Sequence, residues 1–158
     1  MLINCFTYGS LMYEPIMSAI CASKCAGVPA TLPGYRRHPI RDEDYPAMVP
    51  DAAASVSGIL YRDLPAAALT RLDAFEGEQY VRRPVTVLSA DGTQLDAEAY
   101  IFRPQYAELL LPGEWDYARF LASGRHRFEQ QYGGFRRISS GDVRDEPPNE
   151  EATTSRKL

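Results

Sequence analysis

The stretch that decides the fold is Cys5-Phe6-Thr7-Tyr8-Gly9-Ser10-Leu11-Met12. The apolar residues within 2–6 are typical of a buried strand. Gly9 and Ser10 interrupt that run, and Pro15 opens a segment with helical spacing, because proline is tolerated in the first turn of a helix. A strand, a tight turn and a helix start bring several backbone N–H groups to one point, which favours an anion. From these residues alone, a plain strand-to-helix turn remains an alternative.

Length and composition are those of one ordinary globular domain. The chain has 158 residues, enough for a substantial core, with 45% hydrophobic and 24% charged residues. Its net charge of −4 lacks the basic excess of nucleic-acid binders, so we expect no nucleic-acid partner. No apolar run approaches the ~20 residues of a membrane span, so we expect no membrane partner either. Three cysteines and an N-terminus unlike a signal peptide predict a cytoplasmic setting.

Metal-binding and arginine patterns are weak in this chain. Cys21 and Cys25 are four residues apart and could share a helix face, but only two histidines occur and both are distant. We therefore predict buried apolar thiols and no metal site. No cofactor-binding fingerprint is found. Scattered arginine pairs are predicted mostly to face solvent, with one or two as candidates to contact an acidic small molecule: Arg36-Arg37, Arg82-Arg83 and Arg136-Arg137.

Strand-like segments outnumber helical ones, and they are short and rich in Gly and Pro. They do not alternate regularly with helices, so an α+β fold is expected, a small, strongly curved sheet or barrel with two or three helices packed outside. Pro33-Gly34 should bend a strand, and Gly58 indicates a bulge or a close backbone approach. We expect extended segments at 30–38, 45–50, 56–61, 80–88 and 97–103, a hairpin turn at 90–92, and helices beginning at Pro15, at Pro65 and near Trp115.

The end of the chain differs in composition from the rest. From Ser139 to Leu158 apolar residues nearly vanish, while Pro, Glu, Asp, Ser and Thr accumulate. Such a segment cannot bury enough apolar area to offset the entropy of ordering it. We therefore predict one globular domain over residues 1–138 and a disordered acidic and polar tail over 139–158.

Glu76 is the residue best suited to chemistry. It shares one stripe with Leu69 and Leu72 on the helix expected between Pro65 and Gly77, so its side chain should point inward. Burial and the nearby negative end of the helix dipole should both raise its pKa. A carboxylate with a raised pKa suits a general base near neutral pH.

Two alternatives to a catalytic Glu76 follow from the same residues. The carboxylate could be structural and paired with an arginine, either Arg71, Arg82 or Arg83. Asp73, three residues earlier, is a rival base and could equally be a structural hydrogen-bond acceptor.

Several short motifs occur along the chain in a characteristic order. The main ones are Tyr8-Gly9-Ser10-Leu11, Leu72-Asp73-Ala74-Phe75-Glu76-Gly77 and Tyr80-Val81-Arg82. The others are Leu32-Pro33-Gly34-Tyr35, Tyr45-Pro46, Val56-x-Gly58-x-Leu60-Tyr61 and Ala99-Tyr100. Each is short, but the ordered set resembles the γ-glutamylcyclotransferase-like (AIG2-like) family over roughly residues 2–135.

The resemblance implies a fold, a reaction and a set of site residues. The fold is a small mixed β-barrel flanked by helices, and the reaction forms 5-oxoproline from a small γ-glutamyl substrate, releasing an amine or amino acid. The nucleophile is the α-amine of the substrate, so no cofactor is implied. The oligomeric state is left open. The resemblance assigns Glu76 as the catalytic acid/base, the loop Tyr8, Gly9, Ser10 and Leu11 to the glutamyl end, and Tyr80 to the same cavity.

The resemblance leaves the leaving group undetermined. Family members include some that cleave γ-glutamyl-ε-lysine, some that remove a γ-glutamyl protecting group, and many without an assigned substrate. The leaving-group side of the pocket is expected from the loops at 36–44 and 103–114, which carry no diagnostic pattern. A different class of function is a non-catalytic module that binds a small carboxylate in the same cavity. A carboxylate at Glu76 favours the enzyme.

Overall fold

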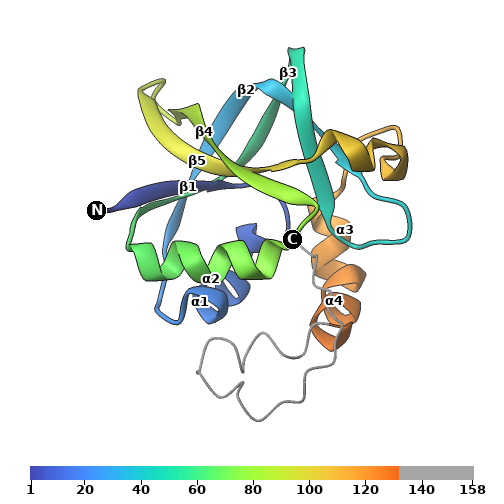
Figure 1. Ribbon diagram of the computed structural model, residues 1–158, viewed down its shortest axis with the longest axis horizontal. Helices are drawn as coiled ribbons and strands as arrows, with labels where there is room; N and C mark the ends of the chain where they lie inside the picture. The colour runs from blue at the N-terminus through green and yellow to red at the C-terminus, as the bar shows by residue number, and fades with distance from the viewer. Residues whose placement is uncertain (132–158) are drawn as a thin grey trace.

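The centre of the computed structural model, which describes residues 1–131, is a closed barrel with the strand order β1-β3-β2-β4-β5 (Figure 1). Its neighbouring strands pair antiparallel except β1 and β5, which are parallel and meet at Cys5 and Glu98. This mixed, strongly curved barrel confirms the predicted α+β class. The strands are β1 (Ile3–Thr7), β2 (Gly27–Pro39), β3 (Pro46–Leu64), β4 (Tyr80–Ser89) and β5 (Gln94–Phe102).

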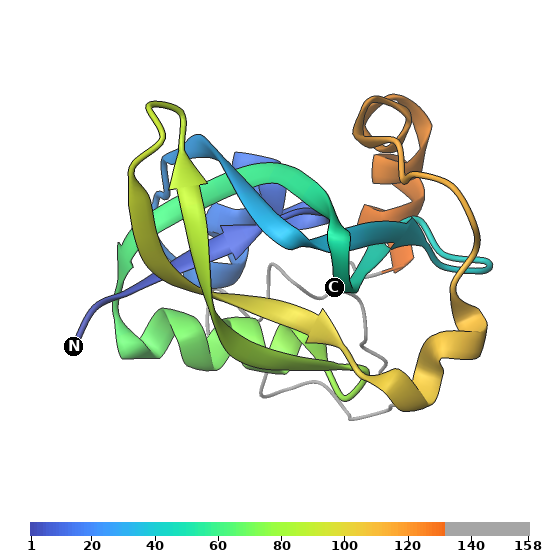
Figure 2. The same ribbon diagram turned by 90° about the horizontal axis from the view of Figure 1, so that it is seen from above.

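Helices cover one side and one end of the barrel. Helices α1 (Glu14–Cys21) and α2 (Ala66–Glu76) pack against each other beside it (Figure 1). The last helical segment stands at the opposite end of the molecule from the β4–β5 hairpin (Figure 2). It consists of α3 (Tyr117–Arg119), the π-helical turn η3 (Phe120–Gly124) and α4 (Arg125–Gln131), and the short 3-10 helices are η1 (Ser10–Met12) and η2 (Pro104–Leu109).

Strand β3 corrects one prediction. The sequence indicated two separate extended pieces at 45–50 and 56–61, whereas the structure has a single strand of 19 residues. The intervening Asp-Ala-Ala-Ala-Ser carries little β propensity, and residues 51–54 bulge at the register shift between the pairs Pro33↔Ser55 and Tyr35↔Pro50. The ladder to β2 continues on both sides of this bulge, from Pro39↔Pro46 to Gly27↔Tyr61, and so keeps β3 one strand. The same pairing starts β2 at Gly27, earlier than predicted. Tertiary pairing overrides local preference at both places.

Two backbone predictions are confirmed in the barrel wall. The β2–β3 register shifts between Pro33 and Tyr35, where a bend was expected. At Gly58 a Cβ atom would lie 2.1 Å from the carbonyl oxygen of Thr7, so this glycine permits a close backbone approach. That approach seats the end of β1 tightly on β3, just before the loop that follows β1.

Buried apolar side chains form two clusters. One fills the barrel and includes Phe6, Leu32 and Leu60. The other lies between the barrel and the helices and includes Ile20 and Leu72. Burying each such side chain contributes about 1.5–3 kcal/mol, so apolar contact holds α2 against the barrel wall.

The structure does not describe the residues on which two of the sequence predictions depend. The tail at 139–158 and the domain boundary at 138 lie outside the described residues. Within residues 1–131, no helix has the length and apolar character needed to cross a membrane, and no group of three or more His, Cys, Asp or Glu side chains is arranged to hold a metal ion.

Candidate functional site

A small cavity lies where the end of β1, the loop after it, α2 and β5 meet. Its volume is about 10 Å³. Among the described residues that line it, Glu76 is the only one with a carboxyl group. The lining residues are Phe6, Thr7, Tyr8, Gly9, Leu11, Glu76 and Tyr100.

Glu76 is the last residue of α2, and its side chain is turned into the molecule. It is only 1% exposed, and Leu69 and Leu72 on the same stripe are also buried. The predicted inward orientation is therefore confirmed. Gly77, which follows with φ 79°, ends the helix and fixes the carboxylate at its final turn.

The two phenols of the cavity are linked through hydrogen bonds. The Tyr8 hydroxyl donates to the Tyr100 carbonyl at 2.5 Å, and the Tyr100 hydroxyl donates to Asp73 Oδ1 at 2.6 Å. Burial first, and then the nearby Glu76 charge, raise the pKa of Tyr8 well above its usual value. Burial also raises the pKa of Tyr100. Both phenols therefore stay protonated at neutral pH.

Asp73 takes the structural role that the sequence left open. Besides the Tyr100 hydroxyl, its carboxylate accepts hydrogen bonds from Arg82 Nε at 2.9 Å and Arg82 Nη2 at 3.1 Å. Its side chain is 45% exposed and does not line the cavity. Arg82 also binds Glu98 at 2.7 Å, so its guanidinium bridges two carboxylates on the outside of the barrel.

The loop after β1 approaches the start of β3 very closely at Gly9. A Cβ atom there would lie 2.7 Å from Cδ and 2.9 Å from Cγ of Pro46. Because φ of Gly9 is −136°, the close approach and not a left-handed conformation requires glycine. The Gly9 carbonyl accepts from Met12 N at 2.9 Å, which closes the turn of η1.

The structure brings Tyr8, Gly9 and Leu11 to the cavity with Glu76, but Ser10 and Tyr80 are not among its lining residues. Ser10 is fully buried. The Tyr80 hydroxyl donates to the carbonyl of Pro46 at 3.0 Å, the residue that Gly9 approaches. Tyr80 thus supports the residue against which the loop packs.

Comparison with known proteins assigns the chain to a family. Residues 5–117 match the family model described as "Gamma-glutamyl cyclotransferase, AIG2-like". The chain belongs to this family. Its membership confirms the resemblance drawn from the ordered motifs, and the barrel with flanking helices is the fold of the solved relatives.

Among the family's members are plant proteins of similar length. "Protein AIG2 C" of Arabidopsis thaliana is 29% identical over 131 residues, covering 82% of this chain and 78% of the relative. "AIG2-like protein D" of the same plant is 32% identical over 114 residues, covering 71% and 74%.

Solved structures show the same fold. An Arabidopsis thaliana protein solved in solution superposes with a TM-score of 0.62 at 25% identity, covering 94% of this chain and 95% of its own. A structure titled "Gamma-glutamyl cyclotransferase" gives a TM-score of 0.59 at 15% identity, with 98% and 93% covered. At that identity the likeness concerns the fold alone.

Arg37 contacts the loop that lines the cavity, and the sequence analysis did not distinguish it from its neighbour Arg36. Its Nη1 donates to the Tyr8 carbonyl at 2.8 Å and to the Ser57 carbonyl at 3.2 Å. Its Nε and Nη2 donate to Glu114 at 3.0 and 2.7 Å. The guanidinium also lies 5.6 Å from the centre of the Trp115 ring. Arg37 therefore ties the loop at Tyr8 to the segment before α3.

The alternation of side chains along a strand is the sequence signal that could have identified Arg37. Successive residues of a strand face opposite sides, so one member of the Arg36-Arg37 pair had to face inward. The pattern did not say which one. In the structure the Arg37 side chain is 11% exposed, whereas Arg36 is 48% exposed and pairs with Asp51 at the surface.

Replacing Arg37 with glutamine should loosen the loop at Tyr8. The change removes charge-assisted hydrogen bonds, so we expect a loss of about 1–3 kcal/mol in the free energy of unfolding. We also expect a 10- to 100-fold drop in kcat/KM for γ-glutamyl compounds, the substrate class proposed below, because a small displacement of a site has an effect of this order. Arg36→Gln is the matched control and should change neither quantity appreciably. Equal effects of the two variants would contradict a positioning role for Arg37.

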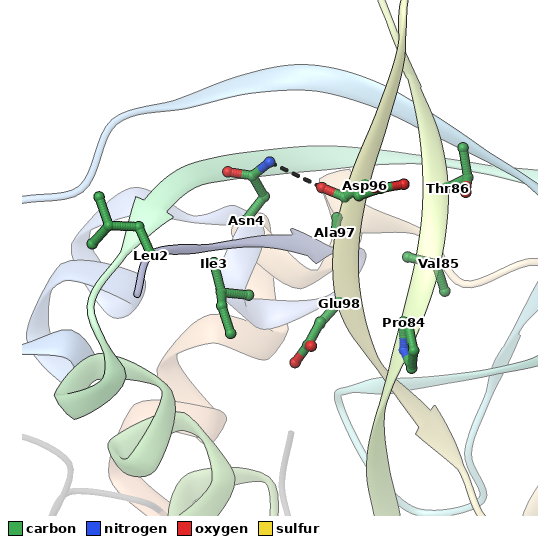
Figure 3. Close-up of a pocket in the computed structure, with 9 residues that line it drawn as sticks. All are labelled: Leu2, Ile3, Asn4, Pro84, Val85, Thr86, Asp96, Ala97 and Glu98. Carbon is green, nitrogen blue, oxygen red and sulfur yellow. Dashed lines mark hydrogen bonds between the residues drawn. The ribbon is translucent and has the colours of Figure 1, made fainter.

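A wider depression of about 550 Å³ opens on the barrel wall where β1 diverges from β5 (Figure 3). Asn4 Nδ2 spans the divergence by donating to the Asp96 carbonyl at 2.9 Å. The acidic side chains that line the depression are Asp96 and Glu98, and Glu98 forms an ion pair with Arg82. The small cavity, and not this depression, combines a buried carboxylate with the Tyr8–Leu11 loop.

Proposed function

We propose that this chain is a γ-glutamyl cyclotransferase that releases an amine or amino acid from a γ-glutamyl compound and forms 5-oxoproline, with Glu76 as the general acid/base. The observation that carries the proposal is the position of Glu76. It is a buried carboxylate in a cavity shared with the Tyr8-Gly9-Ser10-Leu11 loop. Family membership supports the class of reaction.

The reaction needs a proton acceptor from the protein but no protein nucleophile, because the substrate supplies its own. The substrate's α-amine attacks its own γ-carbonyl carbon, a C–N bond closes a five-membered ring, and the original amide C–N bond then breaks. Glu76 takes one proton from the α-ammonium group and returns it to the leaving nitrogen. The ring nitrogen loses a second proton as the new amide forms, and this proton passes through solvent to the released amine. Holding amine and carbonyl in contact supplies much of the remaining acceleration.

The loop after β1 is proposed to bind the anionic part of the substrate. Arg37 Nη1 holds the Tyr8 carbonyl at 2.8 Å. In a trans peptide the carbonyl and the following N–H point in opposite directions, and no cis peptide occurs in the described residues. The Gly9 N–H is therefore directed away from the Arg37 guanidinium. We assign this N–H, with its neighbours in η1, to the α-carboxylate or the developing oxyanion.

The size of the cavity bears on how a substrate enters. A volume of about 10 Å³ is close to the space one water molecule needs. A glutamyl group is larger, so its binding must widen the cavity. The loop at Tyr8–Leu11 is the element we expect to move, because it lines the cavity without belonging to a strand.

The direct test is to incubate the protein with a panel of γ-glutamyl dipeptides and γ-glutamylamines and to measure 5-oxoproline by mass spectrometry. Two controls isolate the mechanism. α-Glutamyl dipeptides have the same composition but the wrong bond, and N-acetylated γ-glutamyl compounds lack the free amine that must attack. We expect product from γ-glutamyl compounds with a free α-amine alone. Binding of these compounds without any product would instead favour the small-carboxylate binding module.

A further inference from the structure

Tyr100 forms hydrogen bonds in two directions, one to the loop after β1 and one to α2. Its backbone carbonyl on β5 accepts the Tyr8 hydroxyl at 2.5 Å. Its own hydroxyl donates to Asp73 Oδ1 on α2 at 2.6 Å. Tyr100 also lines the small cavity and is only 4% exposed. One residue therefore links the start of the loop with the helix that carries Glu76.

The α2 end of this link lies in the same helical turn as Glu76. The Asp73 carbonyl accepts from the Gly77 N–H at 3.2 Å, and this bond closes the last turn of α2 around Glu76. The Asp73 carboxylate is held from the outside by its two hydrogen bonds from Arg82. The acceptor of the Tyr100 hydroxyl is thus fixed, and one turn of helix sets its position relative to Glu76.

The proposed reaction requires two parts of the site to be held at a fixed separation. The loop at Tyr8 is assigned to the anionic part of the substrate, and Glu76 exchanges a proton with the nitrogen atoms of the substrate. Hydrogen bonds are directional, and breaking a buried one leaves polar groups without a partner. A residue that is hydrogen-bonded to both parts therefore resists a change in their separation.

We propose that Tyr100 is a positioning residue that sets the separation between the loop at Tyr8 and Glu76 during cyclisation. This inference rests on the proposed cyclotransferase function. Substrate entry must widen the cavity, and the loop is the element expected to move. The hydrogen bond from Tyr8 to the Tyr100 carbonyl then defines the place to which the loop returns. There the loop holds the glutamyl end at the distance from Glu76 that proton transfer requires.

Tyr100→Phe tests the link, because it removes the hydroxyl and keeps the ring and the backbone carbonyl. We expect kcat for 5-oxoproline formation to fall about tenfold, since a small misplacement of reacting groups has an effect of this order. The loop keeps its N–H groups, so the affinity for an N-acetylated γ-glutamyl compound, measured by titration calorimetry, should stay within about twofold. A merely structural role would instead lower kcat and the number of binding sites per chain together.

Three further variants sharpen the test. Tyr8→Phe breaks the other end of the link, so the double variant with Tyr100→Phe should have a kcat within about threefold of the slower single variant. Asp73→Asn keeps an amide oxygen that can accept the Tyr100 hydroxyl, so it should lower kcat less than Tyr100→Phe does. Tyr117→Phe is the matched control, because Tyr117 lies on α3 and does not line the cavity. It should leave kcat and affinity unchanged.

The outcomes separate this inference from the proposed function. Wild-type protein that forms no 5-oxoproline would refute the proposed function and this inference with it. An active wild-type protein with an equally active Tyr100→Phe variant would refute this inference alone. So would a loss of binding sites that matches the loss of kcat, or a double variant whose loss equals the product of the two single losses.

Discussion

Replacing Glu76 with glutamine is expected to lower the turnover of γ-glutamyl substrates by about 10²–10⁴-fold, the loss typical for a general acid/base. Glutamine keeps the size and shape of the side chain but cannot accept a proton. The phenols of Tyr8 and Tyr100 cannot substitute for it, because burial raises the pKa of both. The rate of 5-oxoproline formation under saturating substrate measures the effect.

The same variant separates a catalytic carboxylate from a structural one through stability. Glu76 is 1% exposed, and a buried charge carries a desolvation cost that a neutral amide avoids. A catalytic Glu76 therefore predicts an unchanged or higher melting temperature for Glu76→Gln. If Glu76 instead formed half of a buried ion pair, the change would cost about 3–5 kcal/mol. Thermal unfolding distinguishes the two readings.

Asp73→Asn is the matched control for Glu76→Gln, because it makes the same carboxylate-to-amide change on the same helix. It weakens the contacts of Asp73 with Arg82 and Tyr100, so some stability should be lost. Turnover should fall by less than about tenfold, since Asp73 does not line the cavity. Wild-type turnover in Glu76→Gln together with an inactive Asp73→Asn would make Asp73 the base.

The local parts of the site were predictable from the sequence. The inward face of Glu76 followed from its spacing to Leu69 and Leu72, because the helical repeat alone fixes which residues share a stripe. Pro65 and Gly77 marked the ends of the same helix. These features depend on residues close together in the chain, and for that reason propensity and periodicity recover them.

The parts that depend on distant pairing were not predictable. Arg37 is positioned by Glu114, which is 77 residues away, and no local pattern links the two. The continuous β3 likewise depends on its ladder to β2. The hydrogen bond of the Tyr80 hydroxyl to the Pro46 carbonyl, 34 residues away, was not predictable for the same reason. Strand periodicity predicts which side of the sheet a residue faces, but it does not predict which distant residues that side chain contacts.

Gly9→Val is expected to abolish the binding of γ-glutamyl compounds while the barrel still folds. Even the Cβ atom would lie 2.7 Å from Pro46 Cδ, and valine adds two methyl groups, so the loop must move off β3. Overpacking of this kind costs about 1–3 kcal/mol of stability. Titration calorimetry with a γ-glutamyl compound that lacks the free α-amine measures binding without turnover, and circular dichroism reports the fold.

A double-mutant cycle shows whether contact with Pro46 causes the loss of binding when Gly9 is replaced. Gly9→Ala places only the Cβ atom against the ring, and Pro46→Ala removes the Cγ and Cδ atoms that it would meet. If the close approach matters, Pro46→Ala should recover much of the affinity that Gly9→Ala loses, so the two changes will be far from additive. Additive losses would mean that Gly9 acts through backbone freedom instead. Normal affinity in Gly9→Val would exclude the loop as the anion site, because a displaced loop cannot keep its N–H groups on the substrate.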